Sequence, residues 1–107
     1  MVSARPPRLT RRLAVSFSTS DSAVPRSGCT VDLSAGGLFL NTRALLTPGA
    51  HVLGRLSLPG GGTCEVHGVV AWHRRAPRAI DAVARGGLGL RLVWADPGYF
   101  AFLAGTA

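Results

Sequence analysis

The chain lacks the groups of residues that most enzyme active sites need. Its 107 residues include only five acidic residues and three histidines, and these are scattered. No acid pair, no nucleophile with a neighbouring base and no metal-binding cluster can be assembled from them. His51, His67 and His73 have neither the HxxxH spacing nor the CxxC partner that zinc sites use. We therefore expect no catalytic residue, no metal and no cofactor, and the protein is not predicted to be an enzyme.

Cysteines and long apolar runs are also scarce. The two cysteines, Cys29 and Cys64, each lie in a strand-like stretch, where a free cysteine behaves as a small buried hydrophobe. We expect two buried thiols rather than a disulfide. No apolar run approaches the roughly 18 residues that a membrane-spanning helix needs, and no signal-peptide core follows the basic N-terminus. The sequence thus predicts a soluble, cytoplasmic protein with no membrane insertion.

Arginine, by contrast, is abundant, and lysine is absent. Twelve arginines against five acids give a net charge of +7, which favours phosphate-bearing partners such as nucleotides, nucleic acid or acidic lipid. Four of these arginines, Arg5, Arg8, Arg11 and Arg12, lie close together near the N-terminus. A guanidinium group suits planar recognition, because it forks two hydrogen bonds to a phosphate or to the O6 and N7 atoms of guanine.

The apolar residues recur with the period of β-strands. Alternation predicts strands at residues 13–18, 51–58, 63–74 and 86–94, and two shorter apolar strands at 29–33 and 37–41. Residues 18–27 are polar and are expected to form an irregular connection. Asp96 is placed to cap a short terminal helix with Pro97 at its first position. Six strands without an earlier amphipathic helix predict one all-β domain, an antiparallel barrel or a compact sandwich.

Two features of these strands carry further predictions. Trp72 and Trp94 fall on apparently apolar strand faces, so both are expected to pack in the core. The turn between residues 29–33 and 37–41 contains Asp32, Ser34 and two successive glycines. Such a turn permits positive φ and lets a flat or anionic group approach the main chain. The same residue types are common in ordinary hairpins, so the turn alone leaves both interpretations open.

Considered together, the arginine-rich segment and this turn resemble the paired signature of a known family. Arg8 and Arg12 are spaced as RxxxR, and about twenty residues later Asp32, Ser34 and Gly37 are spaced as DxSxxG. This pair resembles the signature of the PilZ domain, a bacterial receptor module for the second messenger cyclic di-GMP. The resemblance implies a six-stranded antiparallel β-barrel at residues 13–107 with a C-terminal helix, which is short here, and a flexible basic arm at residues 1–12.

The resemblance also implies how the ligand is held. Arginines of the arm suit the guanine acceptors and the two phosphates of cyclic di-GMP, whereas Asp32 suits the guanine donors N1–H and N2–H₂. The hydroxyl of Ser34 suits a phosphate or a base, and the glycines keep the turn open. The implied ligand-binding residues are Arg8, Arg11, Arg12, Asp32, Ser34, Gly36 and Gly37. Ordering of a flexible arm over the ligand would couple binding to a conformational change, as a switch without catalytic groups requires.

Two other functions compete with this one. A nucleic-acid-binding small β-barrel is favoured by the charge, but only seven aromatic residues are present and they do not gather on one strand. Nucleic acid is therefore the less favoured partner. The other alternative is a PilZ-like domain that has lost nucleotide binding and acts through contacts with a downstream protein partner.

Overall fold

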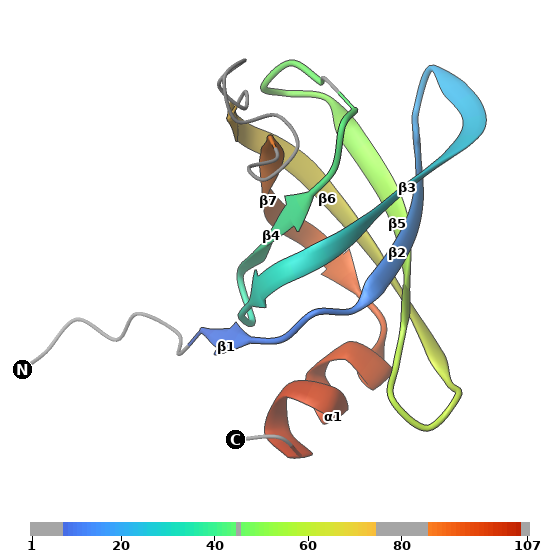
Figure 1. The fold of residues 1–107 in the computed structure, drawn as a ribbon, viewed down its shortest axis with the longest axis vertical. Helices are drawn as coiled ribbons and strands as arrows, with labels where there is room; N and C mark the ends of the chain where they lie inside the picture. The colour runs from blue at the N-terminus through green and yellow to red at the C-terminus, as the bar shows by residue number, and fades with distance from the viewer. Residues whose placement is uncertain (1–7, 45, 75–85, 106–107) are drawn as a thin grey trace, which may run out of the picture.

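The computed structural model describes residues 8–44, 46–74 and 86–105 of the chain (Figure 1). Within these residues lie seven strands and one helix. Their bounds are β1 Leu9–Thr10, β2 Ala14–Thr19, β3 Ser22–Leu33, β4 Gly37–Asn41, β5 His51–Ser57, β6 Thr63–Arg74, β7 Gly87–Ala95 and α1 Pro97–Gly105. Arg5, one of the four clustered arginines, lies outside the described residues.

Six of the strands close into an antiparallel barrel. They are hydrogen-bonded in the order β3-β2-β5-β6-β7-β4, and β4 pairs again with β3. The prediction of an all-β, six-stranded antiparallel barrel with a short C-terminal helix is thereby confirmed. The strand β1 is an addition, because Leu9 pairs with Leu33 and Thr10 with Asp32. The described part of the basic arm is therefore joined to β3 beside the Asp32 turn.

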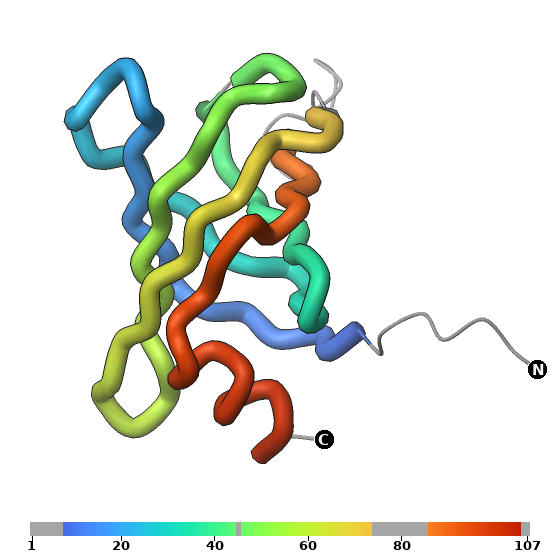
Figure 2. The backbone as a smooth tube through the Cα atoms, turned by 180° about the vertical axis from the view of Figure 1, so that it is seen from behind, coloured from blue at the N-terminus to red at the C-terminus, as the bar shows by residue number. Residues whose placement is uncertain are grey.

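The core is built by residues that alternate along the strands, as in β5, where Val52, Gly54 and Leu56 point inward. Helix α1 crosses one end of the barrel, on the same side as β1 (Figures 1 and 2). It contributes Tyr99, which is fully buried. Both cysteines are free; Cys64 is buried, as predicted, and Cys29 is half-buried. Among the described residues, no helix is long and apolar enough to cross a membrane.

The segment predicted as an irregular connection is instead a β-hairpin. Strand β2 ends at Thr19, and β3 starts at Ser22 and runs for 12 residues. The hydroxyl of Thr19 donates a hydrogen bond to the carboxylate of Asp21 at 2.6 Å, which fixes the tight turn. This end of the hairpin is polar because most of residues 20–27 are exposed, not because the backbone is irregular.

Both tryptophans lie on the outside of the barrel, so the prediction that they pack in the core is wrong. Trp72 is 49% exposed and Trp94 is 52% exposed. The register between β6 and β7 shifts between Val70 and Trp72, and shifts again opposite Trp94. At each bulge one extra residue enters a strand, and a one-residue slip moves every following side chain to the other face.

Candidate nucleotide-binding site

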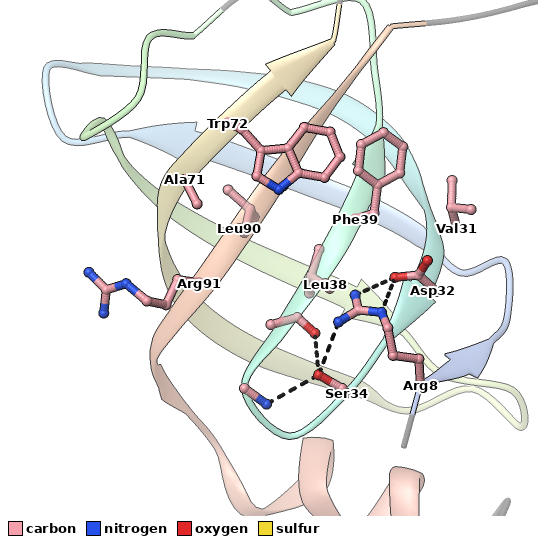
Figure 3. A pocket seen from close by; sticks show the side chains of 13 residues that line it. Arg8, Val31, Asp32, Ser34, Leu38, Phe39, Ala71, Trp72, Leu90 and Arg91 are labelled. Carbon is pink, nitrogen blue, oxygen red and sulfur yellow. Dashed lines mark hydrogen bonds and ion pairs between the residues drawn. The ribbon is translucent and has the colours of Figure 1, made fainter. Parts of the chain in front are cut away.

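A cavity of about 610 Å³ opens on the outer face of the barrel, where β4, β6 and β7 lie beside the end of β3 (Figure 3). Such a volume lies within the range of small-molecule sites. The lining residues are Arg8, Val31, Asp32, Ser34, Gly36, Gly37, Leu38, Phe39, Ala71, Trp72, Gly89, Leu90 and Arg91. Residues from both halves of the proposed signature therefore lie around one cavity.

Arg8 lies on one side of this cavity (Figure 3). Its Nε donates a hydrogen bond to Asp32 Oδ1 at 2.9 Å, and its Nη2 forms an ion pair with the same oxygen. Its Nη1 donates to the hydroxyl of Ser34 at 3.3 Å (Figure 3). The side chains of Arg8 and Asp32 are 48% and 30% exposed, so solvent weakens the ion pair. A ligand that offers better partners can therefore separate Arg8 from Asp32.

The hydroxyl of Ser34 is buried and already has partners within the turn. It donates to the carbonyl oxygen of Gly37 at 3.2 Å and accepts from the N–H of Gly36 at 3.3 Å. The carbonyl oxygen of Ser34 accepts a hydrogen bond from the Tyr99 hydroxyl at 2.7 Å. Burial is the largest cause that raises the pKa of Tyr99 well above its ordinary value, so this hydroxyl remains a donor. Ser34 thus holds the turn in shape and faces Arg8.

The two glycines of the turn have different roles. A Cβ on Gly37 would overlap the carbonyl oxygen of Leu90, because β4 and β7 approach each other closely there. A Cβ on Gly36 would meet nothing within 4 Å. Neither glycine has a positive φ, contrary to the conformation suggested by the glycine pair. Gly37 is required by the close approach of two strands, whereas Gly36 leaves the surface open beside the cavity.

An aromatic pair forms one wall of the cavity. The rings of Phe39 and Trp72 stack with centroids 5.1 Å apart and planes 19° apart. Both side chains lie over β7, where Gly89 pairs with Phe39 on one side and with Trp72 on the other. A Cβ on Gly89 would overlap the Trp72 ring, and one on Gly87 would overlap Phe39. Glycine at these two outward positions therefore provides a flat floor for the aromatic pair.

Phe39, Trp72 and Arg91 line the cavity, but the sequence patterns did not assign them to a site and predicted Trp72 to lie in the core. Arg91 lies on the opposite side of the cavity from Arg8 (Figure 3). The available signal was the alternation of Gly87 and Gly89 with leucine, because outward glycines on a strand mark a place where another group lies against the backbone.

The structure separates the candidate residues into two groups. Arg8, Asp32, Ser34, Gly36 and Gly37 line the first cavity. Arg12 instead lines a separate cavity, together with residues 26–29 and 41–44. The guanidinium carbon of Arg11 lies 5.4 Å from the centre of the Phe102 ring, over helix α1. In this conformation the two arginines of RxxxR are therefore not at the same cavity.

Comparisons with known proteins identify the family. The family model of the PilZ domain matches residues 4–98, so the chain belongs to the PilZ domain family. The structure of Bacillus subtilis inhibitor of motility (MotI/DgrA) superposes with a TM-score of 0.76 at 16% identity, covering 97% of this chain and 49% of that one. The chain thus spans about half the length of that protein.

A second solved structure has the same fold. The PilZ domain of CeSA from a cellulose-synthesizing bacterium superposes with a TM-score of 0.57 at 21% identity, covering 82% of each chain. At these identities the two similarities establish the fold alone. No match was found among curated proteins.

Proposed function

We propose that this protein is a non-catalytic receptor module that binds cyclic di-GMP in the cavity between Arg8 and the aromatic pair. The observation that supports this most strongly is the meeting of Arg8 with Asp32 and Ser34, which come from the two separate parts of the signature. Membership of the PilZ domain family supports the same ligand. The ligand-binding residues under this proposal are Arg8, Arg11, Arg12, Asp32, Ser34, Gly36 and Gly37, to which we add Trp72 and Arg91.

The chemical groups of the cavity match those of the ligand. The carboxylate of Asp32 accepts from N1–H and N2–H₂ of one guanine, which together form a donor edge. The guanidinium groups of Arg8 and Arg91 provide forked donors for phosphate oxygens or for guanine O6 and N7. Trp72 offers a half-exposed ring for stacking, an interaction worth about 1–3 kcal/mol per base.

Binding also changes the contacts of the arm. In the free protein Arg8 satisfies Asp32, so the ligand must replace a surface ion pair that is worth roughly 0–1 kcal/mol. The charge-assisted hydrogen bonds that replace it are worth about 1.5–3 kcal/mol each. The exchange is favourable, and it releases Arg8 from Asp32 so that residues 8–12 rearrange and bring Arg12 to the ligand. This rearrangement is the signal that a downstream protein partner would read.

A calorimetric titration with cyclic di-GMP tests the proposal. We expect binding at tens of micromolar protein, together with a change in tryptophan fluorescence that disappears in Trp72→Phe. Arg8→Gln should weaken binding about ten- to a hundredfold, because it removes a charge-assisted contact. Arg55→Gln is the matched control, since Arg55 is paired with Glu65 and lies outside the cavity. Absence of a calorimetric response to cyclic di-GMP would refute the proposal.

A second candidate function, binding of single-stranded nucleic acid, is favoured by one observation. The half-exposed Trp72 lies between two arginines that line the same cavity, as in sites that stack one base and contact its phosphates. Titration with a single-stranded oligonucleotide at two salt concentrations separates the two functions. Binding that falls steeply with salt and exceeds that of cyclic di-GMP would favour nucleic acid.

A further inference from the structure

Two histidine side chains meet on the outer face of the barrel, between β5 and β6. The Nδ1 atom of His51 lies 2.8 Å from the Nε2 atom of His67, and the ring centroids are 5.0 Å apart. The two residues are 16 positions apart in the chain, so the HxxxH spacing of a helical metal site does not reveal them. They are brought together by the pairing of the two strands.

The pairing of β5 with β6 fixes the positions of both histidines. The two strands pair without a bulge over seven residue pairs. His67 stands opposite Leu53, two residues after His51 on β5, so the histidines are diagonal neighbours on the outer face. The residues that alternate with them, Val52 and Val66 among others, are buried in the core. The backbone beneath the two rings is therefore held on a rigid sheet.

The contact between the two rings is open to solvent and can be exchanged for another. His51 is exposed and His67 is half-buried. Water competes for a hydrogen bond in this position, so the bond adds little to stability. Each neutral imidazole has one N–H and one lone pair. When the donor ring carries its proton on its other nitrogen, both facing nitrogens offer a lone pair and neither ring changes its charge.

The distance between the two nitrogens indicates a class of metal ion. Metal–nitrogen bonds of about 2.0–2.1 Å place two nitrogens about 2.9 Å apart at neighbouring corners of a square-planar or tetragonal ion, and about 3.3 Å apart on a tetrahedral ion. The observed 2.8 Å fits the first arrangement. Cu(II) and Ni(II) prefer this geometry, and imidazole is a suitable ligand for both.

The histidine pair supplies two ligands to such an ion. In the part of the chain that the structure describes, no group of three or more histidine, cysteine or acidic side chains could hold a metal ion, so a four-coordinate structural zinc site is not expected. Arg55 and Glu65, on the same face of the two strands, pair with each other at 2.8 Å and add little net charge. We propose that His51 and His67 form a binding site for a divalent ion of the Cu(II) or Ni(II) class, which links β5 to β6 and is completed by water. The proposal does not depend on cyclic di-GMP binding.

Titration of the full chain, without an affinity tag, with Ni(II) tests this site. Ni(II) is the first probe because Cu(II) oxidises thiols, and Cys29 is a half-buried free thiol. Trp94 is the reporter, because it is half-exposed and stands opposite His67, and an ion with a partly filled d shell quenches the fluorescence of a neighbouring indole. We expect Ni(II) to bind in the micromolar range, to quench Trp94 and to raise the thermal midpoint. In Trp94→Phe the quenching should be lost while calorimetric binding remains.

Histidine variants decide which side chains hold the ion. His51→Gln and His67→Gln should each weaken Ni(II) binding at least about tenfold, because one imidazole remains where two acted together. His73→Gln is the matched control, because it removes the third imidazole, near the end of β6, and should leave the affinity unchanged. The three side chains lie outside the core, so the variants are expected to fold. The proposal is overturned if Ni(II) does not bind, if either His51→Gln or His67→Gln binds it as tightly as the unaltered chain, or if Zn(II) binds more tightly than Ni(II).

Discussion

Replacement of Asp32 by asparagine distinguishes a ligand-binding role from a structural one. In the free protein the Asp32 carboxylate contacts only Arg8 among the described side chains, and both partners are partly exposed. An ion pair of this kind contributes roughly 0–1 kcal/mol. Asparagine keeps one acceptor oxygen, so we expect the free energy of unfolding to fall by less than about 1 kcal/mol. For a domain of this size the thermal midpoint then falls by no more than about 8 °C.

The effect on affinity should be larger. If Asp32 accepts from guanine N1–H and N2–H₂, asparagine removes the charge and turns half of the head group into a donor that faces donors. The lost charge-assisted contact is worth about 1.5–3 kcal/mol, or roughly ten- to a hundredfold in affinity. Because the mutant no longer holds Arg8 as strongly, up to about fivefold of this loss is recovered.

Calorimetry and thermal unfolding of Asp32→Asn measure the two effects side by side. Glu65→Gln is the matched control, because it breaks the other ion pair, with Arg55, and should leave affinity unchanged. The double variant Arg8→Gln with Asp32→Asn measures how strongly the two residues are coupled in the free protein. Unchanged cyclic di-GMP affinity together with lowered stability in Asp32→Asn would show that Asp32 serves the turn, and would refute the reasoning.

Three further predictions concern the aromatic wall, the turn and the buried ionisable groups. Trp72→Ala should weaken cyclic di-GMP about fivefold to a hundredfold by calorimetry and cost less stability than the 3–5 kcal/mol of a buried tryptophan, because the ring is half-exposed; equal affinity with a large stability loss would contradict this. Gly37→Ala should lower the thermal midpoint, whereas Gly36→Ala should not, because only Gly37 lies against a backbone carbonyl; equal midpoints would contradict this. Burial raises the pKa of Cys64 from 9.0 to about 11, and the folded state keeps the proton longer, so its contribution to stability should be complete below pH 9 and lost as pH rises to about 11. We therefore expect the thermal midpoint of Cys64→Ala to fall less than that of the unaltered chain between pH 9.0 and about 11. Identical pH profiles of the two proteins would contradict this.

Several features of this protein follow from local sequence alone. Alternation along β5 places Val52, Gly54 and Leu56 inside and their neighbours outside, because side chains in a strand alternate between its two faces. Asp96 and Pro97 mark the start of α1, since the side chain of Asp96 accepts from the N–H of Gly98. These signals involve residues close together in the chain, and together they predict a small barrel with a terminal helix.

The candidate site was only partly predictable, because its residues are brought together by the pairing of strands that are distant in the chain. The spacing of Asp32 and Ser34 relative to Arg8 indicated three residues that do meet at one cavity. That meeting depends on the pairing of Thr10 with Asp32 across β1 and β3, which the sequence patterns did not predict. The position of Arg12 in a different groove also depends on the path of the chain between β1 and β2.

Only the tertiary structure decided where Trp72 lies, and with it the shape of the cavity. The alternation along β6 places Trp72 inward, on the same face as Val70, but the extra residue Ala71 reverses the pattern. A bulge is set by how two strands pair, and Gly89 on the neighbouring strand is what leaves room for the ring. The sequence by itself determined the alternating strands and the signature; the pairing of distant strands determined which aromatic side chain faces the cavity.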